Sequence, residues 1–143
     1  MTKITDQLTA ILADTYALAV KSHGAHWNVT GPEFFALHAA FGSQYEALFE
    51  AADELAERLR ALGERAPRSI QALAKATGIE AGKDDHGVAL AKSLRDDHRM
   101  LSKACAKAVK VAQEAHDEPT ADLLIGRSEA HDKTAWMLDA VGG

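Results

Sequence analysis

The chain has 143 residues, the length of one domain and enough to bury a hydrophobic core, and 47% of them are apolar. Its 21 acidic residues outnumber 16 basic ones, and this net charge of −5 excludes DNA as a partner attracted by overall charge alone. No apolar run approaches the roughly 18 residues of a membrane span, and no basic-then-apolar leader opens the sequence. Since the single cysteine, Cys105, agrees with a reducing compartment, we expect one cytoplasmic domain over residues 1–143.

Apolar residues recur at steps of three and four in segments separated by proline and glycine, which is typical of amphipathic helices. The first break is Gly31-Pro32, and the proline suits the first position of a new helix. Asp117, Glu118 and Pro119 form the last break and an acidic helix start. In chain order, the sequence predicts long helices over about 5–28, 32–62, 91–115 and 119–138, and a short helix over 70–76.

Residues 64–87 form a long, loop-like connection around the short helix, with one proline and three glycines. A connection of this length is expected where the second and third long helices run parallel and the chain must cross the whole bundle. Each long helix has one apolar stripe, and four such stripes need each other for burial. The sequence therefore predicts an all-α fold, a four-helix bundle with a long crossover that contains a short helix.

The seven histidines are the first candidates for chemistry. His98 and His131 lie on inward stripes, where we expect hydrogen-bonded core histidines, and Cys105 is expected as a small core residue. We expect the histidines near helix ends or in loops to face solvent or cap helices; these are His23, His86 and His116. A Glu-x-x-His motif on two helices, the usual diiron signature of a bundle, does not occur, so any metal site must be built differently.

The pair His26 and His38 stands apart, because the first closes one helix and the second opens the next, so two imidazoles can converge. Asp53 and Glu57 are four residues apart and share one face of the second helix, although an ion-paired, solvated surface is the alternative interpretation. His38 and Asp53 share a side of that helix but are about 22 Å apart along its axis.

Two copies of the second helix, packed antiparallel about a two-fold axis near Tyr45 to Phe49, would bring the histidines of one chain to the carboxylates of the other. Such a contact generates two equivalent sites. Mixed imidazole and carboxylate ligands with open positions suit Fe(II) and its oxidation better than a closed structural zinc site.

Three segments resemble one known family, the Dps-like miniferritins of bacteria. These segments are HWNVTGPEFFALH from His26 to His38, DELAER from Asp53 to Arg58, and HDKTAWML from His131 to Leu138. The similarity in pattern extends over essentially the whole chain. The resemblance is specific, because both the 12-residue spacing of the two histidines and the later Asp-x-x-x-Glu motif match the family pattern.

The resemblance implies a ferritin-like four-helix bundle assembled as a hollow dodecamer in the cytoplasm, with association with the nucleoid as a variant. Such proteins bind Fe(II) between two-fold-related subunits, oxidise it preferentially with hydrogen peroxide and store the Fe(III) mineral, which protects the cell and its DNA from oxidative damage. Carried over by position, the catalytic and metal ligands are His26 and His38 of one subunit and Asp53 and Glu57 of its neighbour.

One position departs from the family pattern. The residue one helical turn after the second histidine is usually acidic, and here it is Gly42, which has no side chain to coordinate iron. We therefore expect a weaker second iron position, with Glu46 reaching partway or acting through water. The alternative is that Gly42 lets paired helices approach closely.

The resemblance also points to a tryptophan beside the centre, which corresponds to Trp27, with either a redox role or simple packing at the helix end. Acidic residues near the start of the fourth helix line three-fold iron pores in the family. The candidates here are Asp117, Glu118 and Asp122, and the first two are equally explained as helix-start residues.

DNA binding is left open but not favoured, because Lys3 is the only basic residue that precedes the first helix. The best remaining basic patch is interleaved with Glu57 and Glu64, as expected for surface ion pairs, and consists of Arg58, Arg60, Arg65 and Arg68. The leading hypothesis is a ferroxidase and iron-storage cage. The alternatives are a structural or nucleoid-associated cage in which Gly42 has removed useful ferroxidase activity, and an unrelated small helical bundle with incidental histidines and carboxylates.

Overall fold

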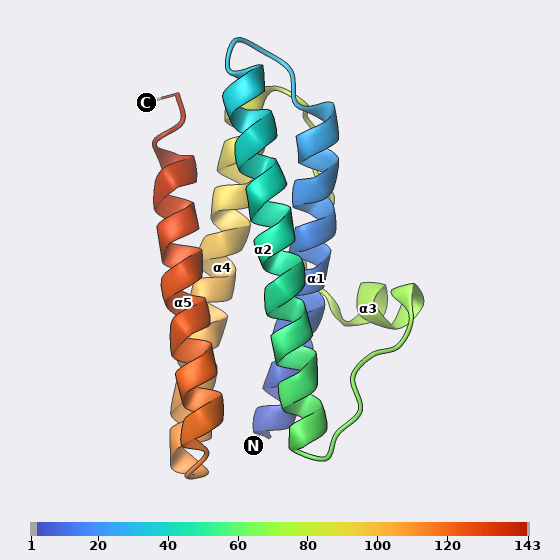
Figure 1. Cartoon of the computed structure of the whole chain (residues 1–143), viewed down its shortest axis with the longest axis vertical. Helices are drawn as coiled ribbons and strands as arrows, with labels where there is room; N and C mark the ends of the chain where they lie inside the picture. Colours follow the sequence, from blue (N-terminus) through green and yellow to red (C-terminus); the bar gives the residue numbers. More distant parts are fainter. Residues whose placement is uncertain (1–2, 143) are drawn as a thin grey trace.

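The computed structural model describes residues 3–142, and within them five helices form and no strand does (Figure 1). Four long helices lie side by side, and α3 stands beside α1, outside the bundle. The helices are α1 (Ile4–Asn28), α2 (Phe34–Ala61), α3 (Ile70–Ala76), α4 (Gly87–Glu114) and α5 (Glu118–Asp139). The predicted all-α four-helix bundle with a crossover and a short helix is confirmed. None of these helices is both long and apolar enough to cross a membrane.

The bundle is built from two helix hairpins, because α1 packs mainly on α2 and α4 mainly on α5, while α1 and α4 join the hairpins. The core between them consists of leucines and small residues. Its fully buried members include Leu8, Leu18, Phe41, Leu55, Leu59, Leu94, Leu101 and Leu124, together with Ala13, Ala19, Ala91, Ala108 and Ala112. Alanine on the inner face of a helix lets the neighbouring helix approach closely at no cost in helix propensity.

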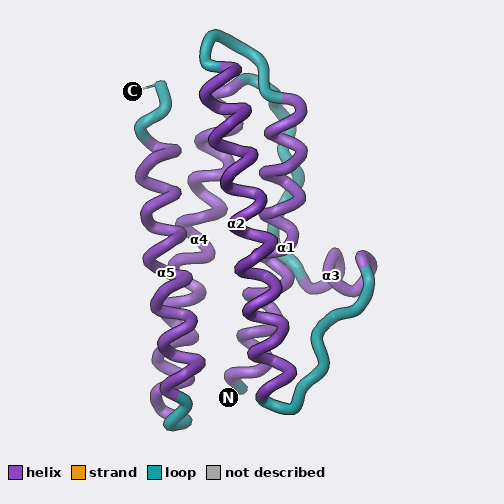
Figure 2. Tube along the Cα trace, in the orientation of Figure 1, coloured by secondary structure: helices purple, strands orange, loops and turns teal. Residues whose placement is uncertain are grey.

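The crossover between α2 and α4 runs from the end of α2 through α3 and back along α1 (Figure 2). None of the residues of α3 is buried. Asp14 of α1 holds the segment after α3, since its Oδ1 accepts hydrogen bonds from Thr77 Oγ1 at 2.6 Å and from the Gly78 amide at 2.8 Å. Near α4, the Thr30 amide donates to the Asp85 carbonyl at 2.8 Å. The crossover is therefore attached to the first hairpin at two points.

Asp117 caps α5, because its Oδ1 accepts a hydrogen bond from the Thr120 amide at 3.2 Å. The Arg58 guanidinium of α2 donates to the same oxygen at 3.0 Å. Burial alone would raise the pKa of Asp117, but the hydrogen bonds from Thr120 and the Arg58 charge outweigh it and hold that pKa below its usual value. Arg58, expected to form an ordinary surface ion pair near Glu57 and Glu64, therefore pairs instead with the residue that caps α5, and this ion pair is largely buried.

The expected core histidines, His98 of α4 and His131 of α5, are buried and joined by a hydrogen bond between their Nδ1 atoms at 2.8 Å. Burial, reinforced by the charge of Arg127, lowers the pKa of His98 to about 4 and that of His131 to about 2. Both are therefore neutral at pH 7. Cys105 is likewise buried, and burial raises the pKa of its thiol to about 11, which makes it unreactive.

We expect the folded chain to lose stability as the pH falls below about 6.5, because unfolded histidines bind a proton there while His98 and His131 in the fold do not. Above about pH 7.5 the contribution of the two pKa shifts to the slope of stability against pH becomes small, because unfolded histidines are then mostly neutral. At pH 5 each histidine contributes a loss of about 2 kcal/mol. Urea unfolding at pH 7.5 and pH 5, compared with a His98→Gln/His131→Gln variant, measures this contribution, and an unchanged slope in the variant would contradict it.

Candidate metal centre

His26 in the last turn of α1 and His38 near the start of α2 face each other across the interhelix turn, as predicted. His26 Nδ1 donates a hydrogen bond to the His38 carbonyl at 2.6 Å, and His38 Nδ1 donates to the His26 carbonyl at 2.7 Å. Because a carbonyl oxygen only accepts, each ring carries its proton on Nδ1. Both Nε2 atoms are left with a lone pair, the form in which histidine binds a metal.

The two rings are stacked, with centroids 3.9 Å apart and an angle of 13° between their planes. Phe34 stacks on the His38 ring at 5.3 Å. The turn that permits this arrangement contains Gly31 with a φ of +113°, a conformation that residues with a side chain rarely adopt. The stack and the paired hydrogen bonds fix the ring orientations before any ion binds.

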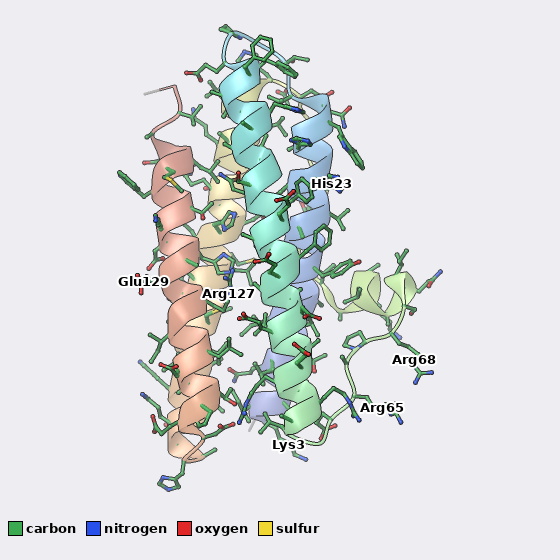
Figure 3. The ribbon with its side chains drawn as sticks, viewed as in Figure 1. Lys3, His23, Arg65, Arg68, Arg127 and Glu129 are labelled. Atoms are coloured by element: carbon green, nitrogen blue, oxygen red, sulfur yellow. The ribbon has the colours of Figure 1, made fainter. Side chains whose placement is uncertain are left out.

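His23 also belongs to this cluster, which corrects its predicted place as a solvent-facing or capping residue. Its ring lies 4.0 Å from Trp27 and is stacked on Tyr45 of α2 at 4.0 Å, and its centroid is 6.4 Å from that of His26. Figure 3 shows His23 on the part of α1 that borders α2. The sequence contained the information for this cluster, because His26 and Trp27 follow His23 by three and four residues, and residues at these spacings are neighbours on a helix. His86, which precedes α4, and His116 are exposed, as predicted.

Gly42 lies directly against the His26 ring. A Cβ added at this position would be 3.0 Å from His26 Nδ1 and 3.1 Å from its Cε1, closer than a side chain normally approaches. The glycine therefore makes room for the histidine within one chain. The close approach of helices that Gly42 permits is therefore between α1 and α2 of the same chain.

Asp53 and Glu57 lie one turn apart and exposed on α2. Asp53 is fifteen residues and Glu57 nineteen residues beyond His38 on the same helix, about 22 Å and 28 Å along its axis, so one chain does not bring them to the histidines. Consistent with this, no group of three His, Cys, Asp or Glu side chains within residues 3–142 could hold a metal ion. Each chain presents a pair of imidazoles and, separately, a pair of carboxylates.

The other predicted site residues have simpler surroundings. Trp27 is 65% exposed beside His23, and Asp122 is exposed on α5. The Asp117 carboxylate is engaged by Thr120 and Arg58, which leaves Glu118 and Asp122 as the free acidic side chains at this end of α5. The pore assignment of Asp122 stays a prediction.

A family model described as "Ferritin-like domain" matches residues 5–142 of this chain. A "DNA protection during starvation protein 2" of Bacillus anthracis is 32% identical over 139 residues, which is 96% of this chain and 95% of that protein. A "DNA protection during starvation protein" of Brevibacillus brevis is 36% identical over 140 residues, with 94% of each chain covered.

Solved structures agree with these relatives. The Dps protein of Vibrio cholerae O1, described as a member of a superfamily of ferritin-like diiron-carboxylate proteins, matches with a TM-score of 0.91 and 33% identity. The match covers 96% of this chain and 87% of that one. The Dps of Staphylococcus aureus matches with a TM-score of 0.92 and 30% identity, covering 96% of this chain and 93% of that one.

We expect Gly42→Ala to stabilise the protein less than Gly126→Ala, or to destabilise it. In a helix interior this change normally gains about 1 kcal/mol. At Gly126 of α5 the added Cβ meets nothing within 4 Å in the chain, whereas at Gly42 it meets the His26 ring at 3.0 Å. Thermal unfolding of the two variants makes the comparison, and equal stabilisation would show that His26 yields without cost.

Proposed function

The chain belongs to the ferritin-like family as a Dps-like miniferritin, and on that premise we propose that it binds Fe(II) at sites shared between two copies, oxidises it and stores the Fe(III) product. The observation that carries the proposal is the His26–His38 pair, which leaves both Nε2 lone pairs for a metal, while no carboxylate within residues 3–142 joins the pair in a possible metal-binding group. Asp53 and Glu57 of the neighbouring copy complete the ligand set. Iron is the substrate of this site.

The chain also has an exposed apolar surface on α1 and α3 that a second copy would cover. Large apolar side chains on α1 and α3 are exposed, namely Tyr16, Val20, Trp27 and Ile70. All of them except Trp27 line an apolar groove of about 400 Å³ between α1, α3 and the following loop, together with Leu73 and Ile79 among others. Contiguous exposed apolar surface marks an interaction site in a soluble protein.

The two-fold axis that we propose passes near Tyr45 and Phe49, which pack on α1. Tyr45 stacks on His23, and Phe49 meets Tyr16 edge to face at 5.2 Å. The adjoining faces of α1 and α2 thus form one surface, and an isologous contact across it creates two equivalent sites per dimer. A closed cage, the dodecamer of the family resemblance, is the assembly that would store the mineral.

The proposed chemistry needs no nucleophile. Two Fe(II) ions give one electron each to hydrogen peroxide, and with two protons the products are two Fe(III) and two waters, so no hydroxyl radical is released. The carboxylates of Asp53 and Glu57 are hard ligands that favour Fe(III), whereas the neutral imidazoles of His26 and His38 bind Fe(II) well. Protection of the cell and its DNA follows from removing both reactants of radical formation.

Gly42 supports one alternative, a structural or nucleoid-associated cage with weak ferroxidase activity. The position supplies no carboxylate, and the His26 ring occupies the space beside it. The basic residues give DNA less support, because Arg58 is paired with Asp117, while Arg65 and Arg68 lie on the loop after α2 (Figure 3). DNA therefore stays outside the favoured function.

Mixed oligomers test whether the site is shared between copies. We expect His26→Ala/His38→Ala and Asp53→Ala/Glu57→Ala each to abolish rapid Fe(II) oxidation. In a dimer that contains one subunit of each variant, one of the two sites lacks both the histidines and the carboxylates, and the other site has all four ligands. Random reassembly of the two variants should therefore restore about a quarter of wild-type activity, since about half of the dimers are mixed. Absence of restored activity in verified mixed cages would contradict a shared site.

Anaerobic Fe(II) titration followed by hydrogen peroxide, with Fe(III) absorbance recorded, separates the ferroxidase from the structural cage. We expect one saturable iron per site, a weaker second one because of Gly42, and fast oxidation on peroxide addition. Titration without any saturable step would support the structural alternative.

A further inference from the structure

A cavity with several polar side chains in its lining lies at the seam between the two helix hairpins, away from the His26–His38 pair. It has a volume of about 150 Å³ and is lined by Gln44 of α2, His98 of α4, and Arg127, His131 and Thr134 of α5, among others. Figure 3 shows Arg127 on the side of α5 that borders α2. We propose that this cavity binds a small inorganic oxyanion of the size of orthophosphate.

The hydrogen bonds around the cavity are consistent with only one assignment of donors and acceptors. The Arg127 guanidinium lies 3.2 Å from His131 Nε2, and because arginine can only donate, that nitrogen accepts. The proton of the neutral His131 ring is therefore on Nδ1, from which it is donated to His98 Nδ1 at 2.8 Å. The neutral His98 ring must then carry its own proton on Nε2.

That Nε2–H group of His98 has no hydrogen-bond partner within residues 3–142, although the residue is only 2% exposed. The buried Nε of Arg127 and the buried Oε1 of Gln44 likewise lack a partner among the described residues. A buried polar group without a partner costs about 1–3 kcal/mol, so three at one cavity call for a ligand. Two of them are fixed N–H donors, and rotation of the Gln44 amide presents a third donor.

The charge at the cavity is positive. Burial lowers the pKa of Arg127, yet the group stays protonated, and none of the ion pairs formed within residues 3–142 includes it. Glu54, whose charge acts on Arg127, is exposed and makes no ion pair with it. A half-buried guanidinium without a carboxylate is expected to hold an anion.

These features also exclude other ligands. A metal cation would be repelled by Arg127, and the lone pairs of both histidines that face the network already accept hydrogen bonds. The volume admits a tetrahedral oxyanion or a few waters but no nucleotide or peptide. An anion here would bond to α2, α4 and α5 together and so connect the two hairpins.

The test is calorimetric titration of orthophosphate into the iron-free wild-type oligomer in phosphate-free buffer. We expect saturable binding of one phosphate per subunit, with competition by sulfate, which has the same shape. Arg127→Gln should weaken binding at least tenfold, because it removes a charge-assisted hydrogen bond. The matched control is Arg68→Gln, which removes the same charge from an exposed loop position and should leave binding unchanged.

A second variant keeps the test decisive should Arg127→Gln fail to fold. Gln44→Glu places a carboxylate of the same shape in the cavity, where it should replace the anion, raise the melting temperature in phosphate-free buffer and abolish the further rise that phosphate causes in the wild type. No saturable phosphate binding to the wild type, or equal binding by the Arg127 and Arg68 variants, would overturn the proposal. So would a wild-type phosphate response in Gln44→Glu.

Discussion

The reciprocal hydrogen bonds between His26 and His38 are the interaction on which the site depends. Each imidazole is held by the backbone carbonyl of the other residue, so two ligands on different helices share one geometry. The stacked rings require α1 and α2 to approach closely at this end, and Gly42 is the residue that makes this approach possible. The same bonds place the protons on Nδ1, so the metal-binding form of both rings is a product of the fold rather than of the ion.

In the proposed shared site, the division of the ligands between two regions of the chain would couple activity to assembly. Helix geometry places Asp53 about 22 Å and Glu57 about 28 Å along α2 from His38, so the folding of one chain does not bring the carboxylates to the imidazoles. The histidines are partly buried and held rigidly, whereas the carboxylates are exposed. Under the proposed function, Fe(II) would meet a complete ligand set only in an assembled oligomer.

Periodicity was sufficient to predict the four long helices, the short helix and the crossover, because each depends on a local pattern of apolar residues and breaks. It also placed His98 and His131 in the core and His26 beside His38. It failed where a side chain finds its partner through tertiary packing. Arg58 crosses to Asp117 and His23 stacks on Tyr45, while the space beside Gly42 is filled by a ring from another helix. A pattern reports the face on which a residue lies, but not which atom it meets there.

The attachment of the crossover to α1 has a consequence for the order of folding. The groups that hold it, Asp14 and Thr30, belong to α1 and the turn after it, not to the helices that the crossover joins. Both hairpins are made of contacts close in sequence, which form quickly, whereas the docking of α4 on α1 must close a long loop. The first hairpin therefore serves as a template, and each anchor shortens the length of chain still to be closed. We therefore expect the parallel arrangement of α2 and α4 to form through shorter loop closures than one closure of the whole crossover would need.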